Sequence, residues 1–301
     1  MASQDDPSSL LGIDLGGRYR IKDFIDSGAF SFVYRACDLN NGTDVAVKVL
    51  QPRCAGQVAI WEMNGERQLL STMSSRSNII DTYDGERHDL TLNIPGSGAS
   101  LTVPLHYVAM ELASGTLSDV VLYRDRFSWD DRLSLFRAVA KGLHQMHISD
   151  IVHRDLKSDN VLLFTAPDQP VAKLCDLGRG VAVNEPRRFP REAYAPGRGH
   201  RLYAPPEYIW EIGSTDPSSW QKGDLYLLGS VLYELATGYQ ITSAVTAAVH
   251  GMANPYQHLS IDERRDRFFG SIRKLEAYYE GRGGFLIRSC RRQSARRGRD
   301  S

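Results

Sequence analysis

The sequence lacks a long hydrophobic run, an excess of charge of either sign and any closely spaced pair of cysteines. No run of about 18 apolar residues occurs, so we expect no membrane-spanning helix in this chain. Lys plus Arg and Asp plus Glu each number 36, a balance that favours neither nucleic acid nor a membrane surface, and we predict no nucleic-acid partner. No C-x-x-C zinc or dithiol site is present, and we expect reduced thiols and a cytoplasmic protein; the cysteines are Cys37, Cys54, Cys175 and Cys290.

The first part of the chain is dominated by β-strand patterns. Residues 1–17 are polar, without the apolar core of a signal peptide, and we expect a flexible lead-in. Alternation of polar and apolar residues at 18–25, and an Asn-Gly turn between the apolar runs that follow, predict three antiparallel strands at 18–25, 31–38 and 45–50. Further strands are expected at 78–86 and 105–112, with a long hairpin between those two. Between the two groups, residues 56–73 show the spacing of a helix, with one apolar face formed by Ala59, Met63, Leu69, Leu70 and Met73.

The second part of the chain is mostly helical in pattern. The exceptions are a strand pair at 161–164 and 171–178 and a loop rich in proline and arginine at 184–206. We therefore expect an α+β protein with a small β-rich lobe over 18–113, a larger helical lobe over 114–290 and a basic end at 291–301. Nothing in the sequence predicts an oligomeric state.

Four chemically reactive residues gather in two neighbouring segments. Asp155, Lys157 and Asn160 lie between apolar runs in "IVHRDLKSDNVLLF", and Asp176 follows the next predicted strand in "LCDLG". Phosphoryl transfer needs a carboxylate that accepts a hydroxyl proton, a cation near the transferred group and oxygen ligands for Mg²⁺. This set of side chains predicts such a reaction.

Several motifs resemble those of protein kinases and follow the order of that family. "HRDLKSDN" is similar to the catalytic loop H-R-D-x-x-x-x-N, "DLG" to D-F-G, "VAVK" to V-A-I-K and "APPEY" to A-P-E. "KGDLYLLG" resembles the central helix of the second lobe, with Asp224 in the position that braces the catalytic loop. The resemblance is to the serine/threonine (Hanks-type) protein kinases. It implies their two-lobed fold over residues 18–301, ATP and Mg²⁺ as cofactors and a protein as substrate.

The resemblance also implies roles for individual residues. Asp155 would be the catalytic base, and Lys157 would offset charge at the γ-phosphate and mark serine/threonine specificity. Lys48 would hold the α- and β-phosphates, while Asn160 and Asp176 would bind Mg²⁺. His153 would pack with Leu70 and Leu177 in the column of buried apolar side chains that the family has inside the domain.

In the family, the lysine that corresponds to Lys48 of "VAVK" forms an ion pair with a glutamate of the following helix. This chain has two candidates for that glutamate. Glu62 and Glu66 lie one helical turn apart. We choose Glu66 because the family places this residue just before an apolar pair, as in "ERQLL". Glu62 is then expected to be a solvated surface residue.

The adenine site implied by the resemblance is apolar. Val33, Ala46 and Leu162 would enclose the base, Met110 would stand at the gate, and the backbone of residues 111–113 would bond the adenine edge. Ordinary core packing explains the same apolar residues equally well at this stage. The complete set expected to contact the nucleotide is Ile25, Gly28, Ser31, Val33, Ala46, Lys48, Met110, Glu111, Ala113 and Leu162.

The phosphate-binding loop departs from the pattern G-x-G-x-x-G-x-V. Its three glycine positions hold Asp26, Gly28 and Ser31, so only the middle glycine remains. Glycine allows the backbone to approach a phosphate closely, and Asp26 repels a triphosphate unless it points outward. We expect a working loop with weakened ATP affinity. The alternative is a pseudokinase that binds nucleotide as a scaffold.

The segment that usually controls such kinases is also unusual. No Ser or Thr lies between Asp176 and Glu207, so we expect no requirement for serine or threonine phosphorylation there, and only Tyr194 and Tyr203 remain. In the family, Arg154 pairs with a phosphorylated residue, and here we expect Glu185 or Glu192 in its place.

His200 stands where serine/threonine kinases usually have threonine. It could hydrogen-bond Asp155, and we expect it to make activity depend on pH near neutrality.

Overall fold

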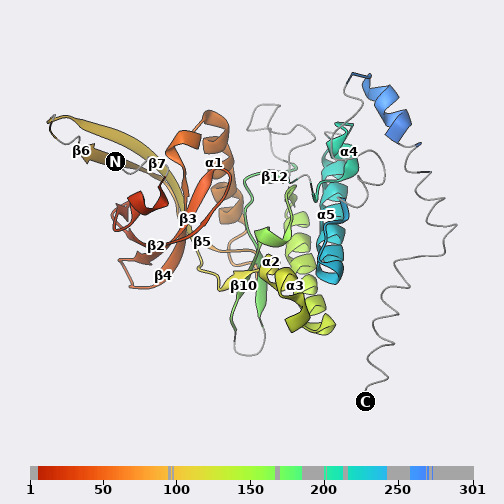
Figure 1. Ribbon diagram of the computed structural model, residues 1–301, viewed down its shortest axis with the longest axis horizontal. Coiled ribbons are helices and arrows are strands. Elements are labelled where there is room, and N and C mark those ends of the chain that lie inside the picture. Colours follow the sequence, from red (N-terminus) through yellow and green to blue (C-terminus); the bar gives the residue numbers. More distant parts are fainter. Residues whose placement is uncertain are drawn as a thin grey trace, which may run out of the picture.

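The computed structural model describes residues 6–93, 96, 98–166, 170–184, 200, 202–212, 216–242, 258–268, 270 and 273. Figure 1 shows a sheet-rich lobe built from the first part of the chain beside a helical lobe built from the second. The expected two-lobed α+β fold is therefore confirmed. In the described part of the chain, no helix combines the length and the apolar character needed to cross a membrane.

The N-terminal lobe is an antiparallel sheet with the strand order β1-β2-β3-β4-β7-β5, and β6 pairs with β7. Its strands are β1 (Asp14–Leu15), β2 (Tyr19–Ser27), β3 (Ser31–Asp38), β4 (Asp44–Leu50), β5 (Thr82–Asp84), β6 (Arg87–Asn93) and β7 (Ser100–Met110). These bounds confirm the strands expected at 18–25, 31–38 and 45–50. The strand expected over 78–86 is shorter, because Ile79 and Ile80 are fully buried in the core between the lobes and Ile79 bridges to Leu174.

The central strand β4 is covered on both faces. Val45, Val47 and Val49 are buried in the apolar cluster on the outer face of the sheet. Ala46 and Leu50 belong to the other cluster, which includes helix α1 (Gln57–Thr72). Because side chains alternate along a strand, position 48 must point to the α1 side. The sequence places a lysine there, in an otherwise apolar strand.

Helix α1 confirms the helix expected over 56–73. Met63 and Leu70 are buried, and Ala59 and Leu69 pack against the same cluster, as the helical spacing predicts. Glu66 lies on this buried face with 1% of its surface exposed. A charged side chain in such a place needs a partner of opposite charge.

The lead-in does not behave as expected from residue 6 on. A 3₁₀ helix, η1 (Pro7–Leu10), packs on the sheet, and Leu10 and Leu15 are buried in its outer cluster. The hydroxyl of Tyr34 donates to the Pro7 carbonyl oxygen at 2.9 Å. Burial of these two leucines holds the segment against β2 and β3, so the flexible lead-in predicted for 1–17 is wrong for its described part.

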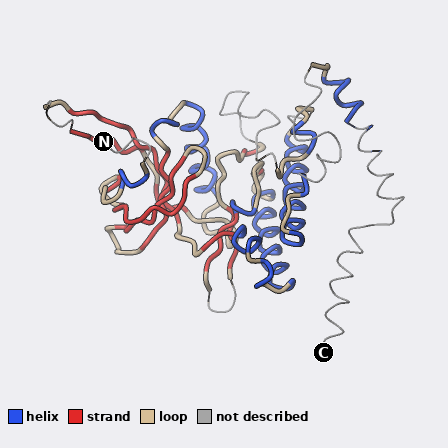
Figure 2. The backbone as a smooth tube through the Cα atoms, viewed as in Figure 1, coloured by secondary structure: helices blue, strands red, loops and turns tan. Residues whose placement is uncertain are grey.

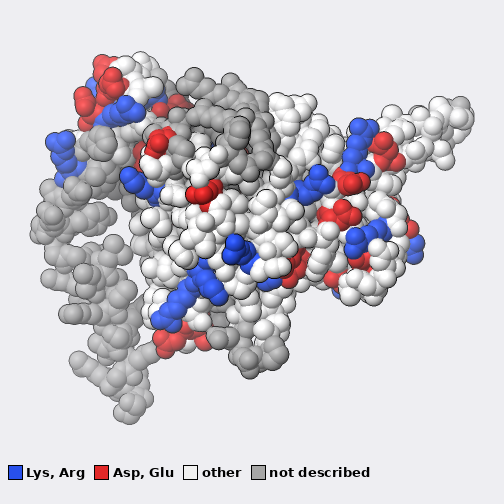
Figure 3. Space-filling view, turned by 180° about the vertical axis from the view of Figure 1, so that it is seen from behind, with Lys and Arg blue, Asp and Glu red and all other residues white. Residues whose placement is uncertain are grey.

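The second arm of the hairpin predicted at 87–104 and the strand predicted at 105–112 form one continuous strand, β7. The first half of β7 pairs with β6, from Arg87 opposite His106 to Asn93 opposite Ser100, and its last residues pair with β4. Figure 2 shows this ribbon projecting from the rest of the lobe. On the face seen in Figure 3 the outer part of the ribbon is largely uncharged, whereas charges of both signs are interspersed near its base.

The C-terminal lobe follows directly after β7. Its elements are β8 (Gly115–Thr116), α2 (Leu117–Leu122), α3 (Trp129–His147), β9 (Ile151–Val152), β10 (Val161–Phe164), β11 (Val171–Leu174), β12 (Val181–Ala182), α4 (Pro206–Ile209) and α5 (Pro217–Thr237), and residues 261–268 are also helical. The short 3₁₀ helices η3 (Arg124–Arg126) and η4 (Ser158–Asn160) also lie in this lobe, whereas η2 (Pro52–Cys54) lies between β4 and α1 in the N-terminal lobe. The small sheets β11-β10-β8 and β12-β9 carry the loops of the candidate site.

Helices α3 and α5 form the scaffold of this lobe. Ser128 and Asp131 form a capping box at the start of α3, and Gly238 ends α5 with a φ of 81°. The two helices pack against each other through apolar residues of the central cluster, among them Leu143 and Val231. Both helices contact β9, which precedes the loop that bears Asp155.

Candidate active site

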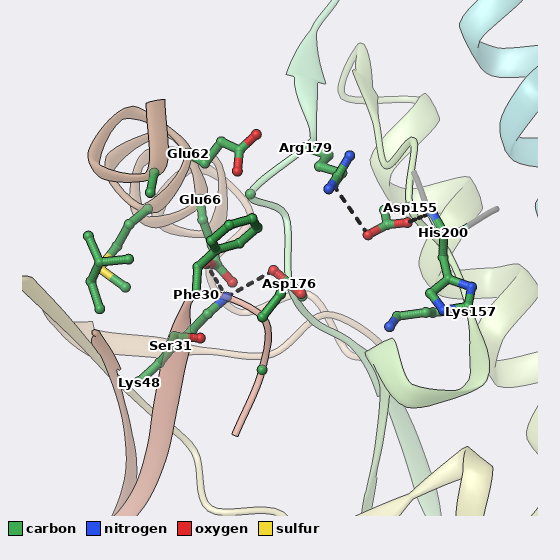
Figure 4. A pocket seen from close by; sticks show the side chains of 16 residues that line it. Phe30, Ser31, Lys48, Glu62, Glu66, Asp155, Lys157, Asp176, Arg179 and His200 are labelled. Carbon is green, nitrogen blue, oxygen red and sulfur yellow. Dashed lines mark hydrogen bonds and ion pairs between the residues drawn. The ribbon is translucent and has the colours of Figure 1, made fainter. Parts of the chain in front are cut away.

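A cavity of about 280 Å³ lies between the two lobes. The β2–β3 turn, β4, α1 and the loops after β9 and β11 line it, as Figure 4 shows. Seven of the residues predicted from the sequence come together here, namely Gly28, Ser31, Lys48, Glu66, Asp155, Lys157 and Asp176. Other lining residues had not been assigned to the site, among them Phe30, Met63, Gly178 and Arg179.

Lys48 joins the two lobes through a pair of carboxylates. Its Nζ donates to Glu66 Oε2 at 2.7 Å and to Asp176 Oδ1 at 2.9 Å. Burial alone would lower the pKa of Lys48, but the charges of Asp176 and Glu66 outweigh burial and raise it. The lysine is therefore charged throughout the physiological range.

The two carboxylates respond differently to the same lysine. Burial raises the pKa of Glu66, and the charge of Lys48 opposes this shift without cancelling it. Burial acts in the same direction on Asp176, yet the charge of Lys48 prevails and lowers its pKa to about 2. Asp176 is thus ionised near neutral pH. Glu66, and not Glu62, is the partner of Lys48, although Glu62 also lines the cavity instead of facing solvent.

The segment after β11 places Asp176 by burying its neighbours. Leu177 is fully buried in the central cluster, and Cys175 is buried on the other side. Asp176 itself has a φ of 58°, a left-handed conformation that costs free energy for a residue other than glycine. Burial raises the pKa of the Cys175 thiol, which fits a packed side chain and no redox role.

The loop that bears Asp155 is braced by a buried carboxylate. Asp224 on α5 has no exposed surface and accepts hydrogen bonds from the backbone N–H groups of His153 at 2.8 Å and Arg154 at 2.7 Å. His147 Nε2 lies 2.9 Å from the same carboxylate. The predicted bracing position of Asp224 is therefore confirmed, and it holds Arg154 at a φ of 66° just before Asp155.

The side chain of Asp155 has distinct neighbours at its two oxygens. The backbone N–H of His200 donates to Oδ1 at 2.8 Å, and Arg179 Nε lies 3.6 Å from Oδ2. The side-chain amide of Asn160 donates to the Asp155 carbonyl oxygen at 2.8 Å. Lys157 lies nearby, with its Nζ 3.4 Å from Asp159 Oδ2.

Arg154 is largely enclosed by its surroundings. It is 6% exposed, and its guanidinium carbon lies 5.2 Å from the centre of the Trp220 ring, within the range of a cation–π contact. One guanidinium nitrogen, Nη1, donates to the Arg179 carbonyl oxygen at 3.4 Å. The partners expected from the sequence, Glu185 and Glu192, lie outside the described residues.

His200 contributes its backbone, and not its ring, to Asp155. The ring packs edge-on against Tyr203, with 5.5 Å between the ring centres. Burial and the charge of Lys157 lower the pKa of His200, against the opposing effect of Asp155. The titration therefore moves away from neutrality toward lower pH, which argues against the expected pH dependence near neutrality.

We expect His200→Thr to leave the shape of the activity–pH profile unchanged between pH 6.5 and 8. The physical reason is that burial and the charge of Lys157 lower the pKa of the imidazole, which moves its titration away from this interval toward lower pH. Initial rates of phosphoryl transfer across the interval measure the profile for both proteins. A step near neutrality that is present only in the unmodified protein would contradict the assignment.

Tyr203 belongs to a buried polar network and is unsuited to modification. It is 3% exposed, its hydroxyl donates to Glu234 Oε1 at 2.6 Å, and Ser158 Oγ lies 3.0 Å away. Gln240 donates to the same Glu234 oxygen at 2.8 Å. Burial, followed by the bond to Glu234, raises the pKa of Tyr203. Of the two tyrosines left in this segment, Tyr194 lies outside the described residues.

We expect Tyr203→Phe to lower the free energy of unfolding by about 1–3 kcal/mol, because the change leaves the buried Glu234 carboxylate with one hydrogen bond fewer. Urea unfolding monitored by tryptophan fluorescence measures the change. Tyr239→Phe removes the same atom from a side chain that is 70% exposed, and should have almost no effect. Equal losses of stability in the two variants would contradict the network.

The residues expected to contact adenine lie beside this cavity and do not line it. Ala46 and Met110 are buried neighbours in adjacent strands, and Val33 and Leu162 pack against the same cluster. Ile25 is 48% exposed on β2. Seven residues that were expected to contact the nucleotide do not line the cavity, and these are Ile25, Val33, Ala46, Met110, Glu111, Ala113 and Leu162. Asn160, an expected Mg²⁺ ligand, does not line it either.

Glu111 has a structural role that the sequence did not reveal. Both of its carboxylate oxygens lie 2.7 Å from Lys173 Nζ on β11, and Oε2 accepts the backbone N–H of Asp81 at 3.0 Å. Its own N–H donates to the Asp81 carbonyl oxygen at 3.2 Å. The side chain thus connects the end of β7 to the C-terminal lobe, and the predicted adenine contact concerns backbone atoms only.

The turn between β2 and β3 covers the cavity. The N–H of Gly28 donates to the Ser31 carbonyl oxygen at 2.8 Å, which closes the turn and places Ala29 and Phe30 at its tip. Asp26 is exposed, and its carboxylate accepts the N–H of the next residue, Ser27, at 2.7 Å. The carboxylate that departs from the glycine pattern is therefore engaged locally, and it does not line the cavity.

The predicted Mg²⁺ ligands suit a weakly held ion. Asp176 offers a carboxylate that is 42% exposed, and Asn160 uses its amide nitrogen toward Asp155, so its amide oxygen is the atom left for a ligand. No cluster of three or more His, Cys, Asp or Glu side chains that could hold a metal occurs among the described residues. Carboxylate and amide oxygens are ligand types that Mg²⁺ prefers, and water and substrate phosphates would supply the remaining ligands.

Comparisons with known proteins agree with this geometry. The sequence model of the protein kinase domain matches residues 19–269. The chain is 27% identical over 247 residues to a probable serine/threonine-protein kinase PknB of Bifidobacterium longum, an alignment that covers 81% of this chain and 33% of that protein. It is 28% identical over 253 residues to the serine/threonine-protein kinase PknL of Mycobacterium tuberculosis, covering 83% of this chain and 56% of that protein.

A eukaryotic relative is similarly distant. The chain is 25% identical over 222 residues to a calcium/calmodulin-dependent protein kinase type II of Caenorhabditis elegans, covering 73% of this chain and 27% of that protein. The chain therefore spans less than two thirds of the length of each of these relatives.

Proposed function

Since the chain belongs to the protein kinase family, we propose that it transfers the γ-phosphoryl group of Mg·ATP to a serine or threonine hydroxyl of a protein. One observation supports this function best. Lys48 is bonded to both Glu66 and Asp176 on one side of the cavity, and Asp155 faces the same cavity from the other side. Phosphoryl transfer depends mainly on such placement of charges, because the protein has little covalent chemistry to perform.

Each side chain then has one task. Lys48, held by Glu66, binds the α- and β-phosphates, and Asp155 accepts the proton of the acceptor hydroxyl. Lys157 offsets charge at the γ-phosphate. Asp176 and Asn160 would hold Mg²⁺, and the ion would neutralise part of the phosphate charge. The apolar group around Val33, Ala46, Met110 and Leu162, with Ile25, Gly28, Ser31, Glu111 and Ala113, encloses the rest of ATP.

The choice of serine and threonine rests on Lys157 and on the similarity to bacterial serine/threonine-protein kinases. We further propose a cytoplasmic location. It is supported by the free thiols of Cys37, Cys54 and Cys175, which are typical of a reducing compartment.

Radiolabelled phosphoryl transfer tests the function. The protein is incubated with Mg²⁺ and γ-labelled ATP, with and without a generic acceptor protein, and labelled products are hydrolysed to identify the phosphoamino acid. Label on serine or threonine supports the proposal, and label on tyrosine contradicts its specificity. Retained ATP binding in a thermal-shift assay without any label would indicate the pseudokinase scaffold instead.

A further inference from the structure

Arg179 is a cation of the cavity that the proposed reaction does not use. It follows Gly178 in the loop after β11, lines the cavity and is 27% exposed. Figure 4 shows its guanidinium pointing toward Asp155. Among the described residues, Asp155 is the one carboxylate within ion-pair distance of this group, at 3.6 Å from Nε. Glu62 also lines the cavity, on the α1 side.

The contact between Arg179 and Asp155 is looser than the contacts of Lys48. Lys48 has carboxylate oxygens at 2.7 and 2.9 Å, whereas 3.6 Å exceeds the length of a hydrogen bond. A guanidinium has five N–H donors in a planar fork that fits a carboxylate or a phosphate through two parallel bonds. Arg179 therefore has donors left for an anion that enters the cavity.

The two oxygens of Asp155 have different neighbours, and Arg179 lies near only one of them. Oδ1 accepts the N–H of His200, so Oδ2 is the oxygen left to accept the acceptor hydroxyl. A base must come within about 2.6–3.2 Å of the proton it removes. The guanidinium of Arg179 near Oδ2 then lies beside the residue that becomes phosphorylated, and it competes with the hydroxyl for the same oxygen.

We propose that Arg179 binds an anionic side chain of the acceptor protein, adjacent to the serine or threonine that is phosphorylated. The anion is a carboxylate or a phosphate, since both fit the guanidinium fork. It gives Arg179 a better partner than the loose contact with Asp155 and frees Oδ2 for the hydroxyl. An acceptor without an anion must displace Arg179 without that compensation. This inference rests on the proposed kinase function and adds the class of its substrate.

Binding of peptides tests the subsite without any need for turnover. Fluorescent peptides with one serine and alanine neighbours are compared with versions that have a glutamate, a phosphoserine or a lysine at each of the three positions on either side. Anisotropy is measured in the presence of Mg·ADP. We expect at least one glutamate and one phosphoserine peptide to bind about tenfold more tightly than the alanine peptide, as for one charge-assisted hydrogen-bond pair.

Three variants assign that preference to Arg179. Arg179→Gln should abolish the difference between acidic and alanine peptides, and Arg179→Lys should retain part of it because the charge remains. Arg137→Gln removes one positive charge from the exposed face of α3 and should keep the full preference. Thermal unfolding of all three checks that they are folded.

Steady-state phosphorylation of the same peptides separates the two proposals. In the unmodified protein, the acidic peptide should have a KM about tenfold lower than the alanine peptide, and this ratio should fall to about one in Arg179→Gln. Equal binding of all peptides would overturn the subsite even if phosphorylation occurs. A preference that persists in Arg179→Gln would also overturn it, as would an equal fall of kcat on every peptide. Tight, Arg179-dependent binding with no phosphorylation of any peptide would support the subsite and refute the kinase function.

Discussion

Asp155→Asn is expected to lower the rate of phosphoryl transfer by about 10²–10⁴-fold, the usual contribution of a positioned general base. The substitution keeps the size and shape of the side chain, and the amide oxygen can still accept the N–H of His200. What is lost is the ability to take the proton of the acceptor hydroxyl. Single-turnover rates with Mg·ATP and a labelled acceptor measure the effect.

The fold of this variant should be unaffected, because the loop is held by Asp224 through the backbone of residues 153 and 154 and not by the Asp155 side chain. Asp125→Asn is the matched control, since it makes the same chemical change at an exposed site in η3. Near-normal turnover in Asp155→Asn would refute the role of this residue as the base.

Lys48→Met is expected to reduce both activity and stability. Loss of the cation removes charge stabilisation from the phosphate site, which costs about 10²–10³-fold in turnover for one such group. The change also leaves Glu66, which is 1% exposed, without its partner of opposite charge. Removing one member of a buried ion pair typically costs about 3–5 kcal/mol of stability. Denaturant unfolding and single-turnover rates measure the two effects.

The loss of stability should depend on pH with a definite sign. Burial already raises the pKa of Glu66 in the folded protein, and without Lys48 only the backbone N–H of Leu177 opposes that shift. A carboxyl group whose pKa is higher in the folded than in the unfolded state costs no stability below its unfolded pKa. The cost grows as the pH rises toward the folded pKa. Lys48→Met should therefore be closer to the unmodified protein at pH 5 than at pH 7.5.

A second substitution separates the two consequences. Lys48→Met/Glu66→Gln removes the unpaired charge as well, so it should recover much of the stability at pH 7.5 without recovering turnover. A Lys48→Met protein as stable as the unmodified one at pH 7.5 would mean that Glu66 is not effectively buried. Restored turnover in the double variant would refute the role of Lys48.

Local sequence patterns predicted the helices and strands that carry the site better than they predicted the side-chain contacts between distant segments. The apolar run after the Asn-Gly turn predicted β4, and helical spacing predicted α1, whereas the choice of Glu66 came from the resemblance to the kinase family. The packing of residues 7–15 on the sheet was not predicted, because three leucines and one isoleucine in so short a segment are too few to establish a helical or strand period. Arg179 was missed for a similar reason, since a lone arginine beside "DLG" gives no signal until Asp155 is seen across the cavity.

The sequence by itself determined a β-rich part followed by a helical part and the residue types available for phosphoryl transfer, because these depend on short-range periodicity and spacing. The two-lobed kinase fold followed from the resemblance of its motifs, in their order, to those of the family. The tertiary structure decided which side chains lie in contact and which pKa values are shifted by that contact. Lys48 and Asp176 are 128 positions apart, and the pKa of each depends on the other. Tyr203 became a buried donor to Glu234, and His200 came to bond Asp155 through its backbone. Burial and Coulomb interactions depend on distances in space, which sequence spacing does not specify.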